Sequence, residues 1–286
     1  MQPMVTLNNG VEMPVLGVGT WQLAEGVAEL VVSEALAVGY RAVDTAAAYG
    51  NERGVGRAVR SSGLARSEVF LTTKLVDREG YRHTVESCHA SLDRLGVEFL
   101  DLYLVHWPFD AVSGETWRAL QDLYADGLVR AIGVSNYSAA RLDRLIRDAE
   151  VVPAVNQIEL HPRLTQIDLR KYCAAQGIAV ESWSPLMQGG ELLDHPVIRS
   201  VAEAAGRTAA QVILRWHVQH GLIVIPRSTN PGRLRENAAL FDFELSAAQL
   251  RVLDGLEENR RASPLADPET YVFSDETYQT LQAMND

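Results

Sequence analysis

The sequence contains Val69-Phe70-Leu71-Thr72-Thr73-Lys74, an apolar run that ends in a lysine. Residues 41–44 have the same form and end in an aspartate, and residues 100–106 end in a histidine. Tyr49 lies in the loop after the first of these runs. If the runs are parallel strands of one (β/α)8 barrel, their carboxyl ends lie side by side on the face where barrel enzymes carry their chemistry. The pattern therefore predicts that a carboxylate, a phenol, an ammonium and an imidazole share one pocket.

Short apolar runs alternate with amphipathic patterns along most of the chain. Eight strand-like runs cover residues 16–19, 41–44, 69–74, 100–106, 131–135, 154–159, 179–184 and 223–226. Helical patterns cover residues 28–38, 84–95, 115–125, 139–149, 169–176 and 209–220. Such alternation indicates a parallel sheet with helices packed on it. A doubly wound sheet also alternates, but eight units favour closure into a (β/α)8 TIM barrel.

The two ends of the chain differ from this repeat. Residues 5–16 contain two short strand patterns around Asn9-Gly10, a dipeptide typical of two-residue hairpin turns. A β-hairpin plug is therefore expected ahead of the barrel. From residue 257 onward the periodicity weakens, so residues 257–286 are expected to form an extended tail. With no low-complexity linker in between, residues 1–286 are interpreted as a single domain.

Composition and charge exclude several classes of function. The net charge of −11 disfavours a nucleic-acid partner, because such partners usually demand a basic face. No run approaches the roughly 18 apolar residues that suggest a membrane span, and residues 1–10 lack the pattern of a secretory signal. We therefore expect a cytoplasmic protein with neither a membrane nor a nucleic acid as its partner. Cys88 and Cys173 each fall in a helical pattern, which predicts packed reduced thiols and no metal site.

The four residues at the run ends suit the delivery of a proton to a carbonyl oxygen. A tyrosine with its ordinary pKa of about 10 is a weak acid at neutral pH. Lys74 beside Tyr49 is expected to lower that pKa, and Asp44 to pair with the lysine. His106 can donate a hydrogen bond to the same carbonyl oxygen. Because the set lacks a nucleophile and a metal cage, a hydride from a bound cofactor is the missing reactant.

Taken singly, each of these residues has an ordinary structural explanation. Asp44 can be a loop carboxylate or a helix cap, and Lys74 can be an exposed strand end. His106 can be a hydrogen-bonded core histidine, and Tyr49 a turn aromatic. Asn51 is interpreted as the N-cap of the helix that follows it. A catalytic role is favoured because Asp44, Tyr49, Lys74 and His106 are all expected on one face of the barrel.

No common nucleotide-binding fingerprint is present. Gly17-Val18-Gly19 and Gly54-Val55-Gly56 each lack the third glycine of a Rossmann loop. The stretch after the eighth run offers another device, since barrels often bind phosphate there. It contains Arg227 and is followed by Arg233, whose guanidinium groups match the geometry of a 2′-phosphate. Read alone, the two arginines are better explained as solvated side chains on a loop and a helix.

With these residues in view, the chain resembles the aldo-keto reductase family over residues 5–256. The resemblance rests on Leu16-Gly17-Val18-Gly19-Thr20-Trp21, Asp44-Thr45-Ala46-Ala47-Ala48-Tyr49-Gly50-Asn51-Glu52, Thr72-Thr73-Lys74 and Asp101-Leu102-Tyr103-Leu104-Val105-His106-Trp107-Pro108. Further matches lie at residues 132–136, 156–159, 182–186 and 235–237. Within the family the chain looks most like the bacterial reductases that include 2,5-diketo-gluconate reductases.

The resemblance implies a barrel that binds NADPH and reduces a small-molecule aldehyde or ketone to an alcohol. It implies a catalytic tetrad of Asp44, Tyr49, Lys74 and His106, with Tyr49 as the general acid. The implied cofactor contacts are Thr20, Trp21, Asp44, Ser135, Asn136, Gln157, Trp183, Ser184, Pro185, Leu186, Gln188, Arg227, Ser228, Arg233, Glu236 and Asn237. Ser135, Asn136 and Gln157 are expected at the nicotinamide carboxamide, and Trp183 on its ring. The pyrophosphate is expected along Ser184, Pro185, Leu186 and Gln188. The 2′-phosphate is expected at Arg227, Ser228 and Arg233, and the adenine near Glu236 and Asn237.

The implied substrate contacts are Trp21, Tyr49, Val76, His106 and Trp107, to which Tyr271 or Phe273 of the tail can be added. Three positions depart from the family pattern. Arg227 stands where lysine is frequent, Val76 where many relatives have tryptophan, and Met187 where glycine is common. We expect these changes to bear on cofactor discrimination, on the substrate wall and on the loop that clasps the cofactor.

Two other functions fit parts of the pattern. Some members of this superfamily sense NADPH as regulatory subunits with little turnover, although this chain has no added domain or charged arm for a partner. A barrel aldolase could instead use Lys74 as a Schiff-base amine. Asp44 and Tyr49 beside the lysine favour a charged ammonium over a reactive amine. By analogy with the family we expect a monomer.

Overall fold

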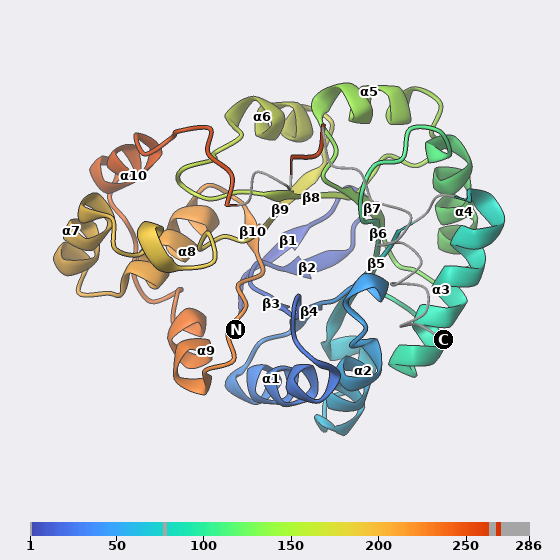
Figure 1. The fold of residues 1–286 in the computed structure, drawn as a ribbon, viewed down its shortest axis with the longest axis horizontal. Coiled ribbons are helices and arrows are strands. Elements are labelled where there is room, and N and C mark those ends of the chain that lie inside the picture. The colour runs from blue at the N-terminus through green and yellow to red at the C-terminus, as the bar shows by residue number, and fades with distance from the viewer. Residues whose placement is uncertain (1, 77–78, 263–266, 270–286) are drawn as a thin grey trace.

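A ring of helices surrounds a central sheet in the computed structural model, which describes residues 2–76, 79–262 and 267–269 (Figure 1). The sheet has eight strands, and every neighbouring pair that shares a ladder is parallel. Its strands are β3 (Val18–Gly19), β4 (Ala42–Asp44), β5 (Phe70–Leu75), β6 (Leu102–Val105), β7 (Ile132–Ser135), β8 (Val155–Glu159), β9 (Ala179–Trp183) and β10 (Ile223–Val224). Each strand lies inside a run that the sequence predicted, except that β5 extends one residue beyond its run.

Hydrogen bonds between the two ends of the sheet close it into a barrel. The strands follow chain order from β3 to β10, and Leu16 forms a parallel bridge with Val224. The backbone N–H of Gly17 donates to the carbonyl of Val224 at 2.8 Å, and the N–H of Val224 donates to Val15 at 2.9 Å. The (β/α)8 barrel is therefore confirmed over the doubly wound alternative.

Helices fill the connections between the strands, as the alternation predicted. They are α1 (Glu25–Val38), α2 (Glu52–Ser61), α3 (Tyr81–Leu95), α4 (Ser113–Ala125), α5 (Ala139–Arg147), α6 (Ile167–Ala175), α7 (Pro196–Ala205), α8 (Ala209–Gln219), α9 (Pro231–Ala238) and α10 (Ala247–Asp254). Short 3-10 turns lie at η1 (Ala47–Tyr49), η2 (Arg66–Glu68) and η3 (Gly190–Leu192). None of the helices in the described part of the chain has the length and apolarity that a membrane span requires.

The sequence interpretation omitted α7 and α10, although both carry boundary signals. Pro196 opens α7 at a position where its missing N–H costs nothing, and Gly206 ends the helix in the left-handed conformation. At α10, Ser246 and Gln249 form a capping box, in which each side chain binds the backbone of the other residue. Reading these signals together with periodicity would have predicted both helices.

The N-terminal hairpin plugs one end of the barrel. Its strands β1 (Met4–Thr6) and β2 (Glu12–Pro14) pair antiparallel, and Gly10 in the turn has a φ of 84°. Leu7 and the fully buried Met13 pack in a cluster with Ala42, Phe70, Leu102, Val155 and Ile223, which are the first residues of their strands. The hairpin therefore closes the amino end of the barrel, and the carboxyl ends of the strands remain as the open face.

Close helix packing explains Gly54 and Gly56, which do not belong to a nucleotide-binding motif. A Cβ at Gly54 would overlap the carbonyl oxygen of Glu25 on α1, and a Cβ at Gly56 would overlap that of Leu95 on α3. The two glycines thus allow α2 to lie against both neighbouring helices. Cys88 and Cys173 are buried and free, which confirms the expected packed thiols.

Candidate active site

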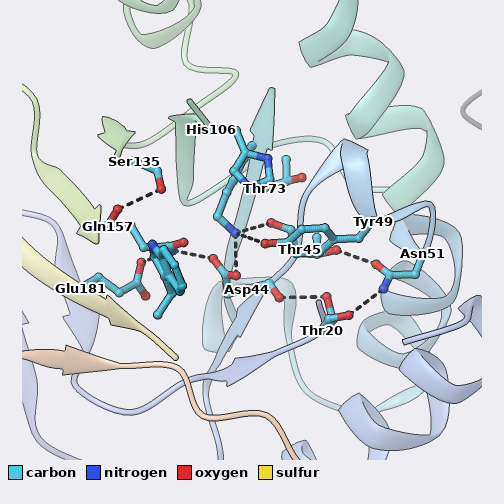
Figure 2. Close-up of polar contacts among 12 residues, drawn as sticks. Thr20, Asp44, Thr45, Tyr49, Asn51, Thr73, His106, Ser135, Gln157 and Glu181 are labelled. Atoms are coloured by element: carbon cyan, nitrogen blue, oxygen red, sulfur yellow. Dashed lines mark hydrogen bonds and ion pairs between the residues drawn. The ribbon is translucent and has the colours of Figure 1, made fainter. Parts of the chain in front are cut away.

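Four strand-end residues meet at the open face of the barrel. Asp44 is the last residue of β4, Lys74 lies near the end of β5, and His106 follows β6. The Nζ of Lys74 donates to the Oδ1 of Asp44 at 2.6 Å, to the carbonyl of Thr45 at 2.9 Å and to the Oη of Tyr49 at 3.3 Å (Figure 2). The rings of Tyr49 and His106 lie 5.6 Å apart in an edge arrangement. The structure thus brings together the four residues that the sequence analysis singled out.

Lys74 is held as an ammonium. Its side chain is fully buried, and burial lowers its pKa. The nearby Asp44, Tyr49 and Glu181 outweigh that effect, so the pKa ends above its ordinary value. A Schiff-base nucleophile needs the neutral amine, so this environment disfavours the aldolase alternative.

Burial and Lys74 act in opposite directions on Tyr49. Burial raises the pKa of the phenol, and Lys74 lowers it, as the sequence predicted. The net pKa is nevertheless raised, so the expectation that the lysine brings it below its ordinary value is wrong. The physical reason is that burial of the phenolate, together with the nearby charges of Asp44 and Glu181, outweighs the effect of the one ammonium. Tyr49 is therefore protonated at neutral pH and can donate a proton.

His106 is neutral. Burial, together with the positive charge of Lys74, lowers its pKa well below the ordinary value of 6.5. Its Nδ1 is buried and has no hydrogen-bond partner among the described residues. An unpaired buried N–H would cost free energy, so we assign the single ring proton to Nε2. A neutral Nε2–H can donate to a carbonyl oxygen without carrying charge into the pocket.

The side chain of Asn51 connects two loops and makes no hydrogen bond to its own helix. It occupies the N-cap position of α2, but its side chain makes no capping hydrogen bond. Its Oδ1 accepts from the Oγ1 of Thr45 at 2.8 Å, and its Nδ2 donates to the carbonyls of Thr20 and Leu23 at 2.9 Å each. The predicted N-cap position is therefore confirmed, but the side chain does not make the capping hydrogen bond. The side chain satisfies buried groups from the loops after β3 and β4, which border the tetrad.

Glu52 ties the segment that carries Tyr49 to β5, which carries Lys74. Its Oε1 accepts from the Oγ1 of Thr73 at 2.6 Å, and its Oε2 accepts from the Nε of Arg94 at 2.6 Å. The carboxylate is buried, so both contacts are made away from water. No role was expected for Glu52 from the sequence. Its one available signal was its position directly after Asn51 in the quoted motif.

Polar side chains at the ends of β7 and β8 lie beside the tetrad. The Oγ of Ser135 donates to the carbonyl of Gln157 at 2.9 Å. The Nδ2 of Asn136 donates to the carbonyl of His106 and to the Oγ of Ser135, each at 3.1 Å. Its Oδ1 accepts from the Nε1 of Trp183 at 2.9 Å. These residues, which the resemblance assigns to the nicotinamide, thus form one connected group.

A buried carboxylate that the sequence analysis missed lies next to this group. The Nε2 of Gln157 donates to the Oδ2 of Asp44 at 2.8 Å and to the Oε2 of Glu181 at 2.7 Å (Figure 2). Burial and the charge of Asp44 raise the pKa of Glu181 to about 8. Glu181 is the one charged residue of β9, and an acidic residue inside a buried strand was the signal available for it.

The loop after β9 has an unusual backbone. Ser184, Met187 and Gln188 have positive φ angles of 49°, 49° and 60°. Such angles are costly for residues other than glycine, so the surrounding structure must hold them. The side chain of Glu191 in this loop pairs with Arg163 at 3.2 Å and with Arg260 at 3.0 Å. Met187, noted above as a departure from a common glycine, therefore adopts the conformation that glycine favours.

The two arginines of the expected phosphate site lie at the entrance to α9. Arg227 and Arg233 are exposed, and neither pairs with a carboxylate in the described residues. The Nη1 of Arg227 donates to the carbonyl of Trp21 at 3.3 Å, and the N–H of Arg233 donates to the Oδ1 of Asn230, the helix cap. An anion is favoured at such a helix start. Ser228 belongs to the same loop.

Other expected contact residues lie on α9 and in the loops after β3, β5 and β6. Glu236 accepts from the Oγ1 of Thr208 at 2.6 Å, and Asn237 is buried on α9. Trp21 is 43% exposed, Val76 is buried, and Trp107 stacks beside His106. Tyr271 and Phe273 lie outside the described residues. Among the described residues no group of three or more histidine, cysteine or acidic side chains is placed to hold a metal ion.

Comparison with known proteins decides the family. A sequence model described as the Aldo/keto reductase family matches residues 15–258 of this chain. The chain belongs to the aldo/keto reductase family. The resemblance drawn from the sequence motifs is thereby confirmed, and membership makes the protein an oxidoreductase.

Relatives of known name match almost the whole chain. Glyoxal reductase of Bacillus subtilis is 49% identical over 269 residues, which cover 93% of this chain and 97% of the relative. A solved structure of a Gox0644 variant in complex with NADPH is 42% identical, with a TM-score of 0.89, and the match covers 96% of this chain and 100% of that one. The aldo-keto reductase of Bombyx mori in complex with NADP is 33% identical, with a TM-score of 0.88 and coverages of 95% and 98%.

The raised pKa of Glu181 predicts a pH-dependent effect of the Glu181→Gln substitution on stability. Between about pH 4.5 and about pH 8 the folded protein holds a proton that the unfolded chain has released, so stability from this group is lost as the pH rises. Glutamine has no proton to lose. We expect the unfolding free energy of the variant, relative to wild type, to rise from about pH 5 to about pH 8 by a few kcal/mol at most.

Urea denaturation at the two pH values measures this difference. Ser182→Ala, at the next buried position of β9, is the control and should change stability equally at both. If Glu181→Gln also shifts stability equally at both values, Glu181 does not retain its proton in the folded protein.

Proposed function

We propose that the protein reduces an aldehyde or ketone to an alcohol with NADPH, and that Tyr49 is the general acid. One observation carries the proposal: the buried ammonium of Lys74 contacts Asp44 at 2.6 Å and the hydroxyl of Tyr49 at 3.3 Å. An ammonium at this position stabilises the phenolate that remains after Tyr49 gives up its proton. A tyrosine that only packed in the pocket would not need a buried ammonium beside its hydroxyl.

The proposed reaction uses the four residues in separate roles. When bound, NADPH supplies a hydride to the carbonyl carbon of the substrate. Tyr49 gives its proton to the carbonyl oxygen, and Lys74 stabilises the phenolate left behind. The neutral His106 donates a hydrogen bond from Nε2 to the same oxygen and orients it. Asp44 holds Lys74 in place, and solvent returns a proton to Tyr49 after the alcohol leaves.

The same proposal places an extended NADPH along the residues expected to contact it. Ser135, Asn136 and Gln157 would hold the carboxamide, with Trp183 against the nicotinamide ring. Thr20, Trp21, Ser184, Pro185, Leu186 and Gln188 would line the ribose and pyrophosphate, and Glu236 and Asn237 the adenine. Arg227, Ser228 and Arg233 would bind the 2′-phosphate. Support comes from the two arginines at a helix start, which pair with no carboxylate in the described part of the chain, and from related structures solved with NADPH and NADP.

The substrate is proposed to be a small carbonyl compound held by Trp21, Val76 and Trp107 beside Tyr49 and His106. Glyoxal is the first candidate to assay, because a relative of 49% identity is named glyoxal reductase. Reduction of 2,5-diketo-gluconate stays a prediction from the motifs. The same proposal includes a single domain over residues 1–286 and a monomer in the cytoplasm.

Tyr49→Phe tests the general-acid role. The substitution removes the proton donor but keeps the ring, so we expect kcat with glyoxal and NADPH to fall about 100-fold or more. The Kd for NADPH should change by no more than about twofold, because the hydroxyl is assigned to the carbonyl oxygen. Loss of NADPH absorbance measures turnover, and fluorescence titration measures binding.

Tyr172→Phe serves as the control, since this tyrosine lies on α6 and interacts with Asp143. Normal turnover by Tyr49→Phe would remove Tyr49 as the acid. Tight NADPH binding by the wild type without turnover of any carbonyl compound would instead support the alternative of an NADPH-sensing regulatory subunit.

Arg233→Ala tests the 2′-phosphate site. Because a hydrogen bond to a charged group contributes about 1.5–3 kcal/mol, we expect the Kd for NADPH to rise roughly 10- to 100-fold. The Kd for NADH, which lacks the phosphate, should stay within about twofold. Arg251→Ala, an exposed arginine on α10, is the matched control. An equal loss for both cofactors would contradict the assignment.

A further inference from the structure

Gln157 makes an unusual pair of contacts. A primary amide has two N–H groups on one nitrogen, and here that nitrogen faces a carboxyl group on each of two sides. The Nε2 of Gln157 lies 2.8 Å from the Oδ2 of Asp44 and 2.7 Å from the Oε2 of Glu181. Both N–H groups are therefore taken up. Among the described residues no donor reaches the Oε1 of Gln157, so this acceptor is left for a ligand.

We propose that Glu181 is a positioning residue that takes up the second N–H of Gln157, so that Gln157 presents only its carbonyl oxygen to the nicotinamide carboxamide. This inference rests on the proposed function. The group of the carboxamide that faces the Oε1 of Gln157 is then its NH2, which donates the hydrogen bond. Glu181 acts through Gln157 and is not assigned a contact with the cofactor.

The barrel geometry fixes the pair. Gln157 on β8 and Glu181 on β9 are register partners in neighbouring parallel strands, and both side chains are buried. Side chains at matched positions of adjacent strands lie on the same side of the sheet. Asp44 approaches the same amide nitrogen from β4, across the barrel from β8. The amide is thus held between two strands that are far apart in the sequence.

A single carboxylate would not restrict the amide in this way. With Asp44 alone, one N–H of Gln157 would remain unpaired and could turn toward the ligand. The amide could then pair with either a hydrogen-bond donor or a hydrogen-bond acceptor of the ligand. It would no longer favour a donor such as the carboxamide NH2. The Oε2 of Glu181 can accept whether the group is ionised or carries its proton on the other oxygen, so the arrangement survives the raised pKa of Glu181.

Two analogues of NADP⁺ probe the prediction directly. The 3-acetylpyridine analogue replaces the carboxamide NH2 with a methyl group and keeps the carbonyl. The thionicotinamide analogue keeps the NH2. Calorimetric titration gives the ratio of the Kd of each analogue to that of NADP⁺. For the wild type we expect the acetylpyridine analogue to bind about tenfold more weakly, as for the loss of one hydrogen bond at a buried acceptor.

Substitutions at residue 181 then separate the proposed role from a general structural one. In Glu181→Leu the freed N–H of Gln157 can donate to the acetyl oxygen, so the acetylpyridine ratio should fall toward one. Glu181→Gln keeps an acceptor at this place and should preserve the wild-type ratio. Ser182→Ala, whose Oγ has no partner among the described residues, should preserve it too. The thionicotinamide ratio should stay the same in every variant.

Each outcome decides between the possibilities. A wild-type acetylpyridine ratio near one overturns the proposal even if no variant folds. A wild-type ratio retained in a folded Glu181→Leu, checked by circular dichroism, overturns it as well. If the wild type binds no NADP⁺ or NADPH, the proposed function fails before the role of Glu181 is reached.

Discussion

A buried ammonium is the constraint around which the active site is arranged. Lys74 has a side chain with no exposed surface, and a charge removed from water is costly unless it is paired and hydrogen-bonded. An ammonium has three N–H donors, and the structure gives them three acceptors: Asp44, the carbonyl of Thr45 and the hydroxyl of Tyr49. Two of these acceptors belong to the loop after β4. That loop must therefore be fixed if Lys74 is to stay charged.

The fold meets this demand with contacts that carry no chemistry of their own. Asn51 ties the loop to the backbone of Thr20 and Leu23, and Glu52 ties it to Thr73, the residue before Lys74. At the opposite end of the barrel, the hairpin seals the amino ends of the strands with apolar side chains. The amino end of the barrel is thus filled, and a substrate would enter from the carboxyl face.

Much of this arrangement follows from the sequence because it depends on local patterns. Each strand is a short apolar run, and a polar residue at its carboxyl end reaches the open face through the geometry of a parallel barrel. That rule placed Asp44, Lys74 and His106 together without any knowledge of their contacts. Family motifs supplied the remaining expectations for the cofactor, which the pattern of strands and helices does not contain.

Predictions from the sequence failed where contacts with groups distant in the sequence outweigh a local sequence preference. Asn51 follows the rule for helix caps, but buried carbonyls some 30 residues earlier claim its side chain. The pKa of Tyr49 depends on burial as well as on its neighbour, and burial is not visible in a motif. Glu181 looked like one residue of a strand, because its partner Gln157 is defined only by the register between β8 and β9.

The central claim is that the charge of Lys74, held in place by its ion pair with Asp44, promotes proton transfer from Tyr49 during carbonyl reduction. Its most direct test is single-turnover oxidation of bound NADPH by glyoxal in the double variant Asp44→Asn with Lys74→Met, which removes both charges and leaves neither unpaired. The account predicts a folded protein that binds NADPH but transfers hydride about 100-fold more slowly or worse. A double variant that transfers hydride at the wild-type rate would contradict it.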